Sequence, residues 1–439
     1  MRHPARLVPT AFLVAIAAGT VLLMLPMARA GPGGAPLLTA LFTATSAVCV
    51  TGLTVVDTPT YWSPFGLGAI LALFQIGGFG IMSGATLLGM LAGRRLRLSA
   101  RMVAHAERGT LDAADMLGVL RLILIVTLVI ELAVAAWLAA YLHYDRGLAW
   151  DRAAWTGLFH SVSAFTNAGF STWSDSLIGF RSEAAMLVPV MLAIVAGALG
   201  FPVLNDLRRA PLRPAAWSLH SKITVLGSLI LLAAGFVATL AAEWTNPATL
   251  GAMGVGDKLL NSAFHSVTPR SGGLNTLDVG AFRIETLAIN YVLMFIGGGS
   301  AGTAGGIKVT TFFLLGLVVW SEIRGERDVA IFGRRIGTHV ERQALTVVLL
   351  AIGLVGMATL AVLALTDFPF HEVMFETISA FATVGLSTGI TPDLPAAAQL
   401  IIIALMFVGR VGTITVATAL ALGAGHRPYR YPEERPIVG

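Results

Sequence analysis

The sequence predicts an all-α polytopic membrane protein. Its eight transmembrane helices are expected to form four repeats of a helix, a re-entrant pore helix, a loop and a second helix (M1-P-M2). Three observations support this fold class: an apolar composition, a series of long apolar runs, and one glycine-centred motif that recurs four times. The chain is 56% hydrophobic and only 12% charged, with a mean hydropathy of +0.80. A soluble fold could not keep that much apolar surface out of water.

Eight apolar runs are long enough to cross a hydrocarbon layer of roughly 30 Å, which takes about 20 helical residues. They lie near residues 8–27, 65–91, 118–142, 184–204, 223–243, 286–320, 344–366 and 397–422. The first run follows two arginines and precedes Ala28-Arg29-Ala30, so a cleaved secretory signal is an alternative. Because its apolar stretch is longer than the usual signal core, a retained helix is favoured.

The arginines predict how the chain is oriented. Basic residues crowd the segments between every second span and the chain ends, which hold twenty of the 29 Lys and Arg. The positive-inside rule places these segments, and both termini, in the cytoplasm. Nucleic-acid binding is not expected, since no arginine cluster is interleaved with aromatic residues. A single cysteine, Cys49, excludes a disulfide framework and a multi-cysteine metal site.

Four polar loops share a glycine that is followed by Leu or Phe and then by a small polar residue. They read CVTGLTVVD (49–57), TNAGFSTWSD (166–175), RSGGLNTLD (270–278) and ATVGLSTGITPD (382–393). Their glycines are Gly52, Gly169, Gly273 and Gly385, about 105 to 117 residues apart, and a phenylalanine lies nine or ten residues before each: Phe42, Phe159, Phe264 and Phe375. Such a period predicts internal repeats, at residues 1–93, 94–208, 209–325 and 326–439.

Each repeat is expected to contain a spanning helix, a helix of about a dozen residues, the polar loop and a second spanning helix. A helix that short cannot cross, so it should dip into the membrane and return as a hairpin. Loop backbone at membrane depth is tolerated only where protein buries it or where it lines a water-filled path. Ordinary helix-breaking turns are the alternative, but four loops in register favour one shared axis.

The chemistry expected at that axis is cation binding by main-chain oxygens. Carbonyl groups turned toward it would replace the water shell of a dehydrated ion. Glycine permits the backbone angles that this requires, and the C-terminal ends of the short helices add partial negative charge. The expected selectivity filter holds K+ at the backbone carbonyls of Val50, Thr51, Gly52, Asn167, Ala168, Gly169, Ser271, Gly272, Gly273, Thr383, Val384 and Gly385.

The fourfold pattern, with VTGLT, NAGFST, SGGLNT and TVGLST, resembles the Trk/Ktr/HKT superfamily of potassium transporters over essentially the whole chain. Eight spans without an additional N-terminal pair are most similar to the bacterial Ktr-type membrane subunit. In this superfamily, glycine in all four loops accompanies potassium preference, whereas serine in the first loop accompanies sodium permeation in some plant members. Position 52 is glycine here.

The resemblance implies potassium uptake across a bacterial cytoplasmic membrane, with K+ as the transported ion. Na+ as a coupling or activating ion stays open. The resemblance also implies a membrane homodimer with one pore per protomer, and a cytoplasmic ring of RCK/KTN-type regulatory subunits that binds ATP or ADP.

The sixth apolar run is interrupted by GGGSAGTAGGIK (297–308), which has six glycines among its first ten residues. At about 1 kcal/mol per glycine relative to alanine, a continuous helix is not expected there. A broken helix at this depth normally lines a cavity or moves, and the resemblance implies an intramembrane gating loop at 297–307. Small-residue helix packing is the alternative. The expected gating residues are Gly297, Gly298, Gly299, Gly302, Gly305, Gly306, Lys308 and Arg410.

Two basic residues fall where lipid would reject them, and a third breaks the pattern of the glycine loops. Arg410 lies in the last span and Lys308 follows the glycine-rich segment, where a fixed positive charge would act as an electrostatic barrier below the filter. The family carries an arginine that lines the pore at the position of Arg410. Structural pairing of Arg410, and snorkelling or capping by Lys308, are the alternatives. Arg270 departs from the other loops and is expected to be tied to a carboxylate such as Glu376.

For the other polar residues, a structural role is the alternative to a functional one. His160 and His265 occupy equivalent places in the second and third repeats, where structural hydrogen bonding is favoured over a metal site. An acidic residue follows each loop, either as part of a cation funnel or as a helix cap: Asp57, Asp175, Asp278 and Asp393.

No nucleotide-binding motif or catalytic signature occurs in the chain, so it is not expected to be an enzyme or to hold a cofactor. Uptake must draw on ion gradients or the membrane potential. Three competing hypotheses stay open: a secondary carrier with a midplane site at broken helices, a sodium-permeable member of the same superfamily, and an intramembrane enzyme. A carrier would show inverted two-part symmetry, and an enzyme would need paired catalytic or metal-binding side chains on spanning helices.

Overall fold

The computed structural model describes residues 7–101, 113–326 and 328–412, and helices dominate these residues. The first quarter contains α1 (Leu7–Met24), α2 (Leu37–Val48), α3 (Thr58–Tyr61) and α4 (Pro64–Arg101). The second contains α5 (Ala113–Tyr144), α6 (Trp150–Thr166), α7 (Ala184–Leu199) and α8 (Phe201–Arg209). The third contains α9 (Leu219–Glu243), α10 (Val255–Val267), α11 (Ile284–Phe295) and α12 (Val309–Ile323). The fourth contains α13 (Thr338–Leu365), α14 (Phe370–Phe381) and α15 (Ala396–Phe407).

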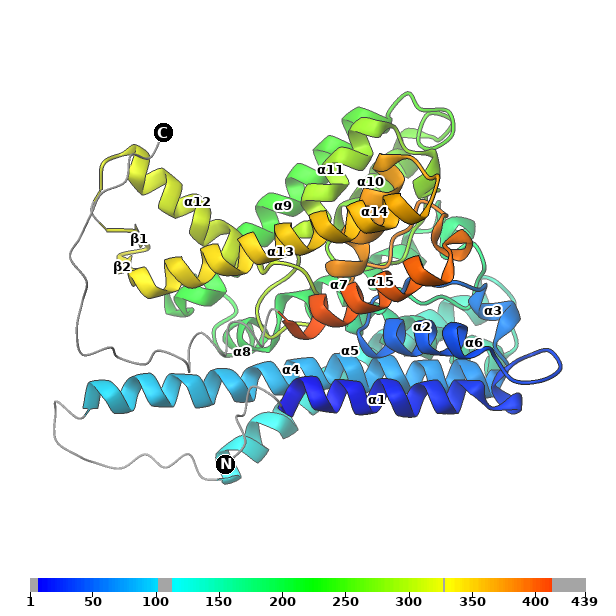
Figure 1. The fold of residues 1–439 in the computed structure, drawn as a ribbon, viewed down its shortest axis with the longest axis horizontal. Coiled ribbons are helices and arrows are strands. Elements are labelled where there is room, and N and C mark those ends of the chain that lie inside the picture. The colour runs from blue at the N-terminus through cyan, green and yellow to red at the C-terminus, as the bar shows by residue number, and fades with distance from the viewer. Residues whose placement is uncertain (1–6, 102–112, 327, 413–439) are drawn as a thin grey trace.

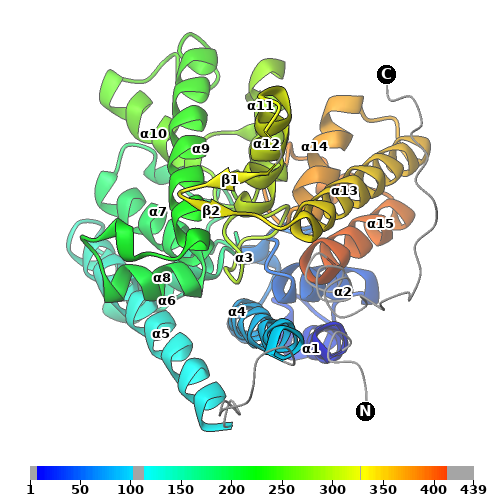
Figure 2. The same cartoon turned by 90° about the vertical axis from the view of Figure 1, so that its left-hand side faces the viewer.

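A two-stranded antiparallel hairpin, β1 (Ala330–Ile331) and β2 (Arg334–Arg335), joins α12 to α13. Seen end-on, successive quarters of the chain follow one another around the molecule (Figure 2). The blue helices α1 and α4 lie at the bottom, α5 to α8 at the left, α9 to α12 at the top and α13 to α15 at the right. From the side, α1 and α4 run along one edge of the molecule (Figure 1). The four short helices, α2, α6, α10 and α14, are therefore contributed by four different sectors.

Two of the helical runs do not continue straight. α7 and α8 meet at Gly200 with a bend of 103°, which the sequence analysis did not anticipate. α11 ends at Phe295 and α12 begins at Val309, so the glycine-rich segment between them is not helical. Both interruptions come at glycines, where the helix gains least from each added residue.

Fewer than the predicted eight helices are long and apolar enough to span a membrane among the residues that the structure describes. Four described helical stretches are long and apolar enough to cross a bilayer: Pro64–Gly84, Leu117–Tyr144, Leu219–Glu243 and Thr338–Leu365. The bent pair α7 and α8 makes a fifth if it is counted as one span. The apolar part of α1, α11, α12 and the end of the described chain are shorter. The breaks at Gly200 and at 296–308 explain part of this difference, and the eighth predicted run extends beyond the described residues.

Aromatic side chains pack the short helices into the core. The phenylalanines that precede the four glycines, Phe42, Phe159, Phe264 and Phe375, are each fully buried (0% exposed). Phe74 of α4 meets Phe159 edge to face and stacks on Phe170, with ring centroids 5.4 and 6.0 Å apart. Since lipid tails are as apolar as these rings, close van der Waals packing and not removal from water supplies the stabilisation, and these contacts hold the short helices in place.

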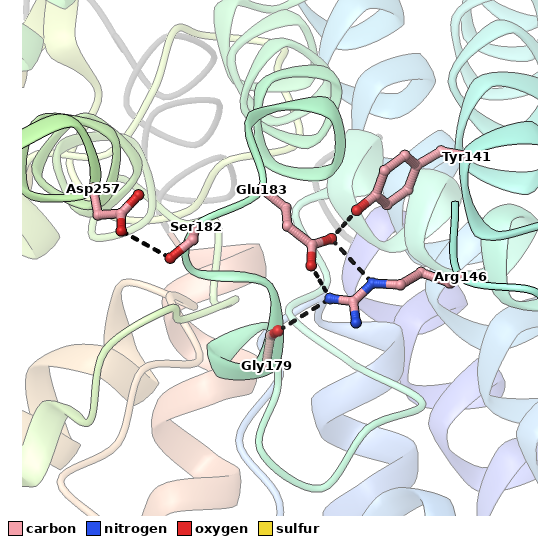
Figure 3. A network of polar contacts seen from close by, with 6 residues as sticks. All are labelled: Tyr141, Arg146, Gly179, Ser182, Glu183 and Asp257. Atoms are coloured by element: carbon pink, nitrogen blue, oxygen red, sulfur yellow. Dashed lines mark hydrogen bonds and ion pairs between the residues drawn. The ribbon is translucent and has the colours of Figure 1, made fainter. Parts of the chain in front are cut away.

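A polar network fixes the end of α5 against the segment before α7 (Figure 3). The Glu183 carboxylate accepts from the Tyr141 hydroxyl and pairs with the Arg146 guanidinium, whose Nε lies 3.3 Å from Glu183 Oε2. Next to it, Ser182 Oγ donates to Asp257 Oδ2 of α10 at 2.9 Å. The network therefore connects the second and third quarters of the chain.

Candidate functional site

The four glycine loops leave their short helices through similar turns. In three loops, an amide donates back to the carbonyl five residues earlier: Thr51 to Ser46 at 2.7 Å, Ala168 to Ser163 at 2.7 Å, and Val384 to Ser379 at 2.8 Å. In the third loop, Gly272 N donates to Thr268 O at 2.7 Å. These bonds occupy helix-end carbonyls that would otherwise stay unpaired.

The loop backbone has a left-handed residue two positions before each glycine and again at the glycine. The φ angles are 56° at Val50, 62° at Asn167, 80° at Ser271 and 47° at Thr383. At Gly52, Gly169, Gly273 and Gly385 they are 92°, 71°, 70° and 91°. A side chain in this region of φ costs about 1–2 kcal/mol, and β-branched Val50 and Thr383 are especially unfavourable there. The surrounding fold must therefore impose the shape, as at many functional sites.

The four glycines meet in a closed ring. A Cβ atom placed on Gly169 would lie 2.9 Å from Gly273 Cα, and one placed on Gly52 would lie 2.9 Å from Gly169 Cα. One placed on Gly385 would lie 3.1 Å from Gly52 Cα, and one on Gly273 would lie 2.6 Å from Val384 O beside Gly385. Each loop thus adjoins the next, in chain order, with no room for a side chain.

Main-chain oxygens lie at these contacts. The carbonyl of Ala168 lies 2.5 Å from where a Cβ on Gly52 would stand, and that of Thr51 faces Gly385 in the same way. In three of the four loops, the residue before the glycine thus turns its carbonyl toward the neighbouring loop. This arrangement can present oxygen ligands to a dehydrated cation.

Sequence reasoning missed a serine that supports three of the loops. It lies six residues before the glycine and precedes an alanine: Ser46, Ser163 and Ser379. Ser46 Oγ accepts from Gly52 N at 3.0 Å, Ser163 Oγ donates to Phe170 O at 2.7 Å, and Ser379 Oγ donates to Leu386 O at 2.6 Å. The repeated Ser-Ala pair was the signal that could have identified them.

The third loop has Val267 at that position and is supported differently. Ser271 Oγ donates to Thr383 O of the fourth loop at 2.7 Å and accepts from Gly305 N at 3.0 Å. The same hydroxyl therefore connects two glycine loops with the glycine-rich segment 296–308.

Segment 296–308 closes on itself as a loop and packs against the glycine loops. Ile296 and Ile307 form a parallel bridge, and Gly297 N donates to Ile307 O at 2.9 Å. Thr303 Oγ1 reaches Phe165 O near the end of α6 at 3.2 Å. A Cβ on Gly200 would stand 2.5 Å from Ser300 O, so the bend between α7 and α8 receives the tip of this segment.

Two buried arginines, Arg270 and Arg410, and the half-buried Lys308 hold the segment by its carbonyls. Arg410 Nη1 donates to Thr303 O, and Lys308 Nζ donates to Ala304 O at 2.5 Å. Arg270 Nη2 donates to Gly297 O at 3.2 Å.

The predicted pairing of Arg270 with Glu376 is wrong. Arg270 bonds Ser228 and Gly297, because helix α9 and the glycine-rich segment surround it. Glu376 instead accepts from Ser387, Thr388 and Thr391, which follow the fourth glycine.

The two histidines are hydrogen-bonded within the fold. His160 Nδ1 lies 2.9 Å from Thr156 O and its Nε2 lies 3.1 Å from Ser171 Oγ. His265 Nε2 lies 3.1 Å from Asn290 Oδ1. These hydrogen bonds give both imidazole rings a structural role.

Among the four acids, the side chain of Asp278 caps a turn, and that of Asp57 bonds two hydroxyl groups. Asp278 Oδ1 accepts from Gly280 N at 3.0 Å. Asp57 precedes α3 and accepts from Thr60 Oγ1 at 2.5 Å and from Ser174 Oγ of the second loop at 2.8 Å. Capping and a role in attracting cations are compatible, since a carboxylate that accepts one hydrogen bond has further lone pairs to offer.

The fold and the ring define a multi-pass helical membrane protein of the transport class. A family model described as "TrkH: Cation transport protein" matches residues 2–424. The chain belongs to the TrkH cation transport family.

Similar proteins agree with this family. The Ktr system potassium uptake protein B of Bacillus subtilis is 37% identical over 436 residues, covering 99% of this chain and 97% of that protein. The potassium/sodium uptake protein NtpJ of Enterococcus hirae is 34% identical over 443 residues, with the same coverage. The crystal structure of the potassium transporter TrkH from Vibrio parahaemolyticus superposes with a TM-score of 0.75 at 17% identity, covering 94% of this chain and 84% of that one.

Proposed function

We propose that this chain is the ion-conducting subunit of a potassium uptake system of the cytoplasmic membrane, and that its four glycine loops form the selectivity filter. The ring made by Gly52, Gly169, Gly273 and Gly385 carries the proposal. Only a backbone without side chains lets four loops approach so closely that carbonyl oxygens replace a hydration shell. The relatives named for potassium uptake supply the identity of the ion.

The same proposal includes eight spans in four helix, pore helix, loop, helix repeats, at residues 1–93, 94–208, 209–325 and 326–439, with both termini inside. The order of long and short helices around the molecule supports it (Figure 2). In this arrangement the short helices point their partially negative C-terminal ends at the ring, which favours a cation.

Segment 297–307 is proposed as the gate, with Lys308 and Arg410 as the positive charges below the filter. Its bonds to Phe165, Ser271 and Gly197 support this role, because they hold it directly beneath the loops. Opening would break backbone bonds and leave the segment to move aside. A homodimer and a nucleotide-binding regulatory ring in the cytoplasm complete the proposal, and the "Ktr system" relatives support a partner subunit.

The Enterococcus hirae relative is named for potassium and sodium uptake, so a subunit that also conducts sodium is a second candidate function. Glycine at all four ring positions favours potassium, since the loops offer only main-chain oxygens there. A secondary carrier for another solute is less favoured, because the ring has four similar sides.

The test is ion uptake in cells that lack their own potassium importers, with and without a regulatory subunit. Gly52→Ser should lower the K+ over Na+ preference severalfold, because its Cβ would displace the Ala168 carbonyl 2.5 Å away. Gly68→Ser is the matched control, since a Cβ there meets no atom within 4 Å. Unchanged selectivity in Gly52→Ser would overturn the filter assignment.

The gate is tested by removing residues 299–305. Flux per copy of protein should rise, since the deletion takes away the bonds to Thr303 and Gly305. If the shortened protein folds, as judged by gel filtration and thermal unfolding, and its flux does not rise, the gating role is refuted.

A further inference from the structure

A carboxylate lies in the middle of a membrane-spanning helix, away from the ring. Glu131 of α5 is near the centre of the apolar stretch Leu117–Tyr144 and is 2% exposed. Leaving an ionised carboxylate unpaired at this depth costs several kcal/mol. Ionisable side chains in such places usually take a functional partner.

The hydrogen bonds around Glu131 are incomplete. Gln75 Nε2 of α4 donates to Glu131 Oε2 at 2.9 Å, which holds the two side chains edge to edge. Three buried oxygens on α4 and α5 have no hydrogen-bond partner among the described residues: Glu131 Oε1, Gln75 Oε1 and Thr127 Oγ1. Thr127 lies one turn before Glu131 and is also 2% exposed, so both occupy the same face of α5.

Protonation does not resolve all of these unpaired atoms. A neutral Glu131 could donate its O–H to Gln75 Oε1, but Thr127 Oγ1, which bonds neither side chain, would still lack a partner. Turning the Gln75 amide around would bring two oxygens together and free its NH2 group. Buried polar atoms in folded proteins nearly always have a partner, and a cation at the three oxygens would supply one to all of them.

We propose that Glu131, Gln75 and Thr127 form a binding site for a dehydrated monovalent cation of the size of Na+. Carboxylate, amide and hydroxyl oxygens are the hard ligands that such cations take. The single carboxylate neutralises one positive charge. A divalent ion would leave the buried site with a net positive charge, and three oxygens are too few ligands for it.

The site is separate from the ring but braced against it. Ser161 Oγ of α6 donates to the Glu131 main-chain carbonyl at 2.6 Å. Phe74, next to Gln75, packs on Phe159 and on Phe170 of the second loop. A bound cation would therefore tie α4 and α5 together directly behind the helix that leads to the second loop. The inference does not depend on the proposed filter or gate.

Thermal unfolding of the purified protein in detergent tests the site. KCl is kept at a fixed, saturating concentration, so that sites for K+ stay filled, while NaCl replaces choline chloride at constant ionic strength. We expect the wild-type Tm to rise with NaCl and to level off, because a ligand that binds only the folded state stabilises it. Glu131→Gln should abolish the rise, and radioactive Na+ binding under these conditions should fall by one ion per chain.

Thr127→Val removes one oxygen without changing charge or shape, so it should raise the half-saturating NaCl concentration about tenfold. Thr239→Val is the matched control, because Thr239 of α9 also has a buried, unpartnered hydroxyl, distant in sequence from the site. An absent Na+ response in the wild type, or an equal response in the wild type, Glu131→Gln and Thr127→Val, would overturn the proposal.

Discussion

Arg270 Nη2 donates a hydrogen bond to the carbonyl oxygen of Gly297 at 3.2 Å, which ties the third glycine loop to the first glycine of segment 296–308. The same guanidinium bonds the main-chain and side-chain oxygens of Ser228 at 3.2 and 3.1 Å. One buried arginine thus connects α9, a proposed filter loop and the proposed gate. If segment 296–308 moves, either the hydrogen bond from Arg270 to Gly297 breaks or Arg270 moves with the segment.

Arg270→Gln should destabilise the protein by about 2–3 kcal/mol, because it leaves buried carbonyl oxygens without charged donors. Thermal unfolding in detergent measures the loss. Ser228→Ala removes only the side-chain acceptor and should cost about 1 kcal/mol. If the two variants unfold at the same temperature, the bond to Gly297 contributes nothing.

Gly200→Ala should disturb the docking of segment 296–308. Its Cβ would stand 2.5 Å from Ser300 O and 2.9 Å from Gly302 N, and its φ of 87° is unfavourable for alanine. We expect a higher potassium flux per copy of protein, measured with proteoliposomes, because the closed arrangement loses about 1–2 kcal/mol. Gly316→Ala in α12, where a Cβ meets no atom within 4 Å, is the control and should behave as wild type.

Gly169→Ala should nearly abolish potassium uptake. The added methyl would lie 2.9 Å from Gly273 Cα, so two glycine loops would have to separate. Alanine at Gly356, in the middle of α13 with open space around it, should instead leave uptake unchanged and raise stability by up to about 1 kcal/mol. Uptake assays with equal membrane levels of both proteins decide this, and normal transport by Gly169→Ala would contradict a tight ring.

Glu183→Gln should lower the unfolding free energy by about 1 kcal/mol, because it weakens the contacts with Arg146 and Tyr141 shown in Figure 3. The estimate is small because the pair is partly exposed, with side chains 38% and 25% accessible. Asp328→Asn breaks the more exposed pair with Arg335 and should have no measurable effect. Equal shifts in Tm for Glu183→Gln and Asp328→Asn would show that the Glu183 network stabilises the protein no more than an exposed ion pair does.

Composition and local pattern determined the class of the protein, its helical character, and the positions of the four glycines. Apolar runs and glycine loops are local signals, since each depends on residues that are near one another in the chain. Six glycines in ten residues likewise predicted where a helix would fail to form, between α11 and α12.

Partners of buried polar groups were decided by tertiary structure. Arg270 bonds Ser228 and Gly297, 42 and 27 residues away, and not Glu376. The bend at Gly200 depends on segment 296–308, which fills the space beside it. The acceptor cluster of Glu131 arises only because α4 brings Gln75 to it from 56 residues away. Such choices follow from which helices become neighbours, and a pattern along one helix carries no information about its neighbour.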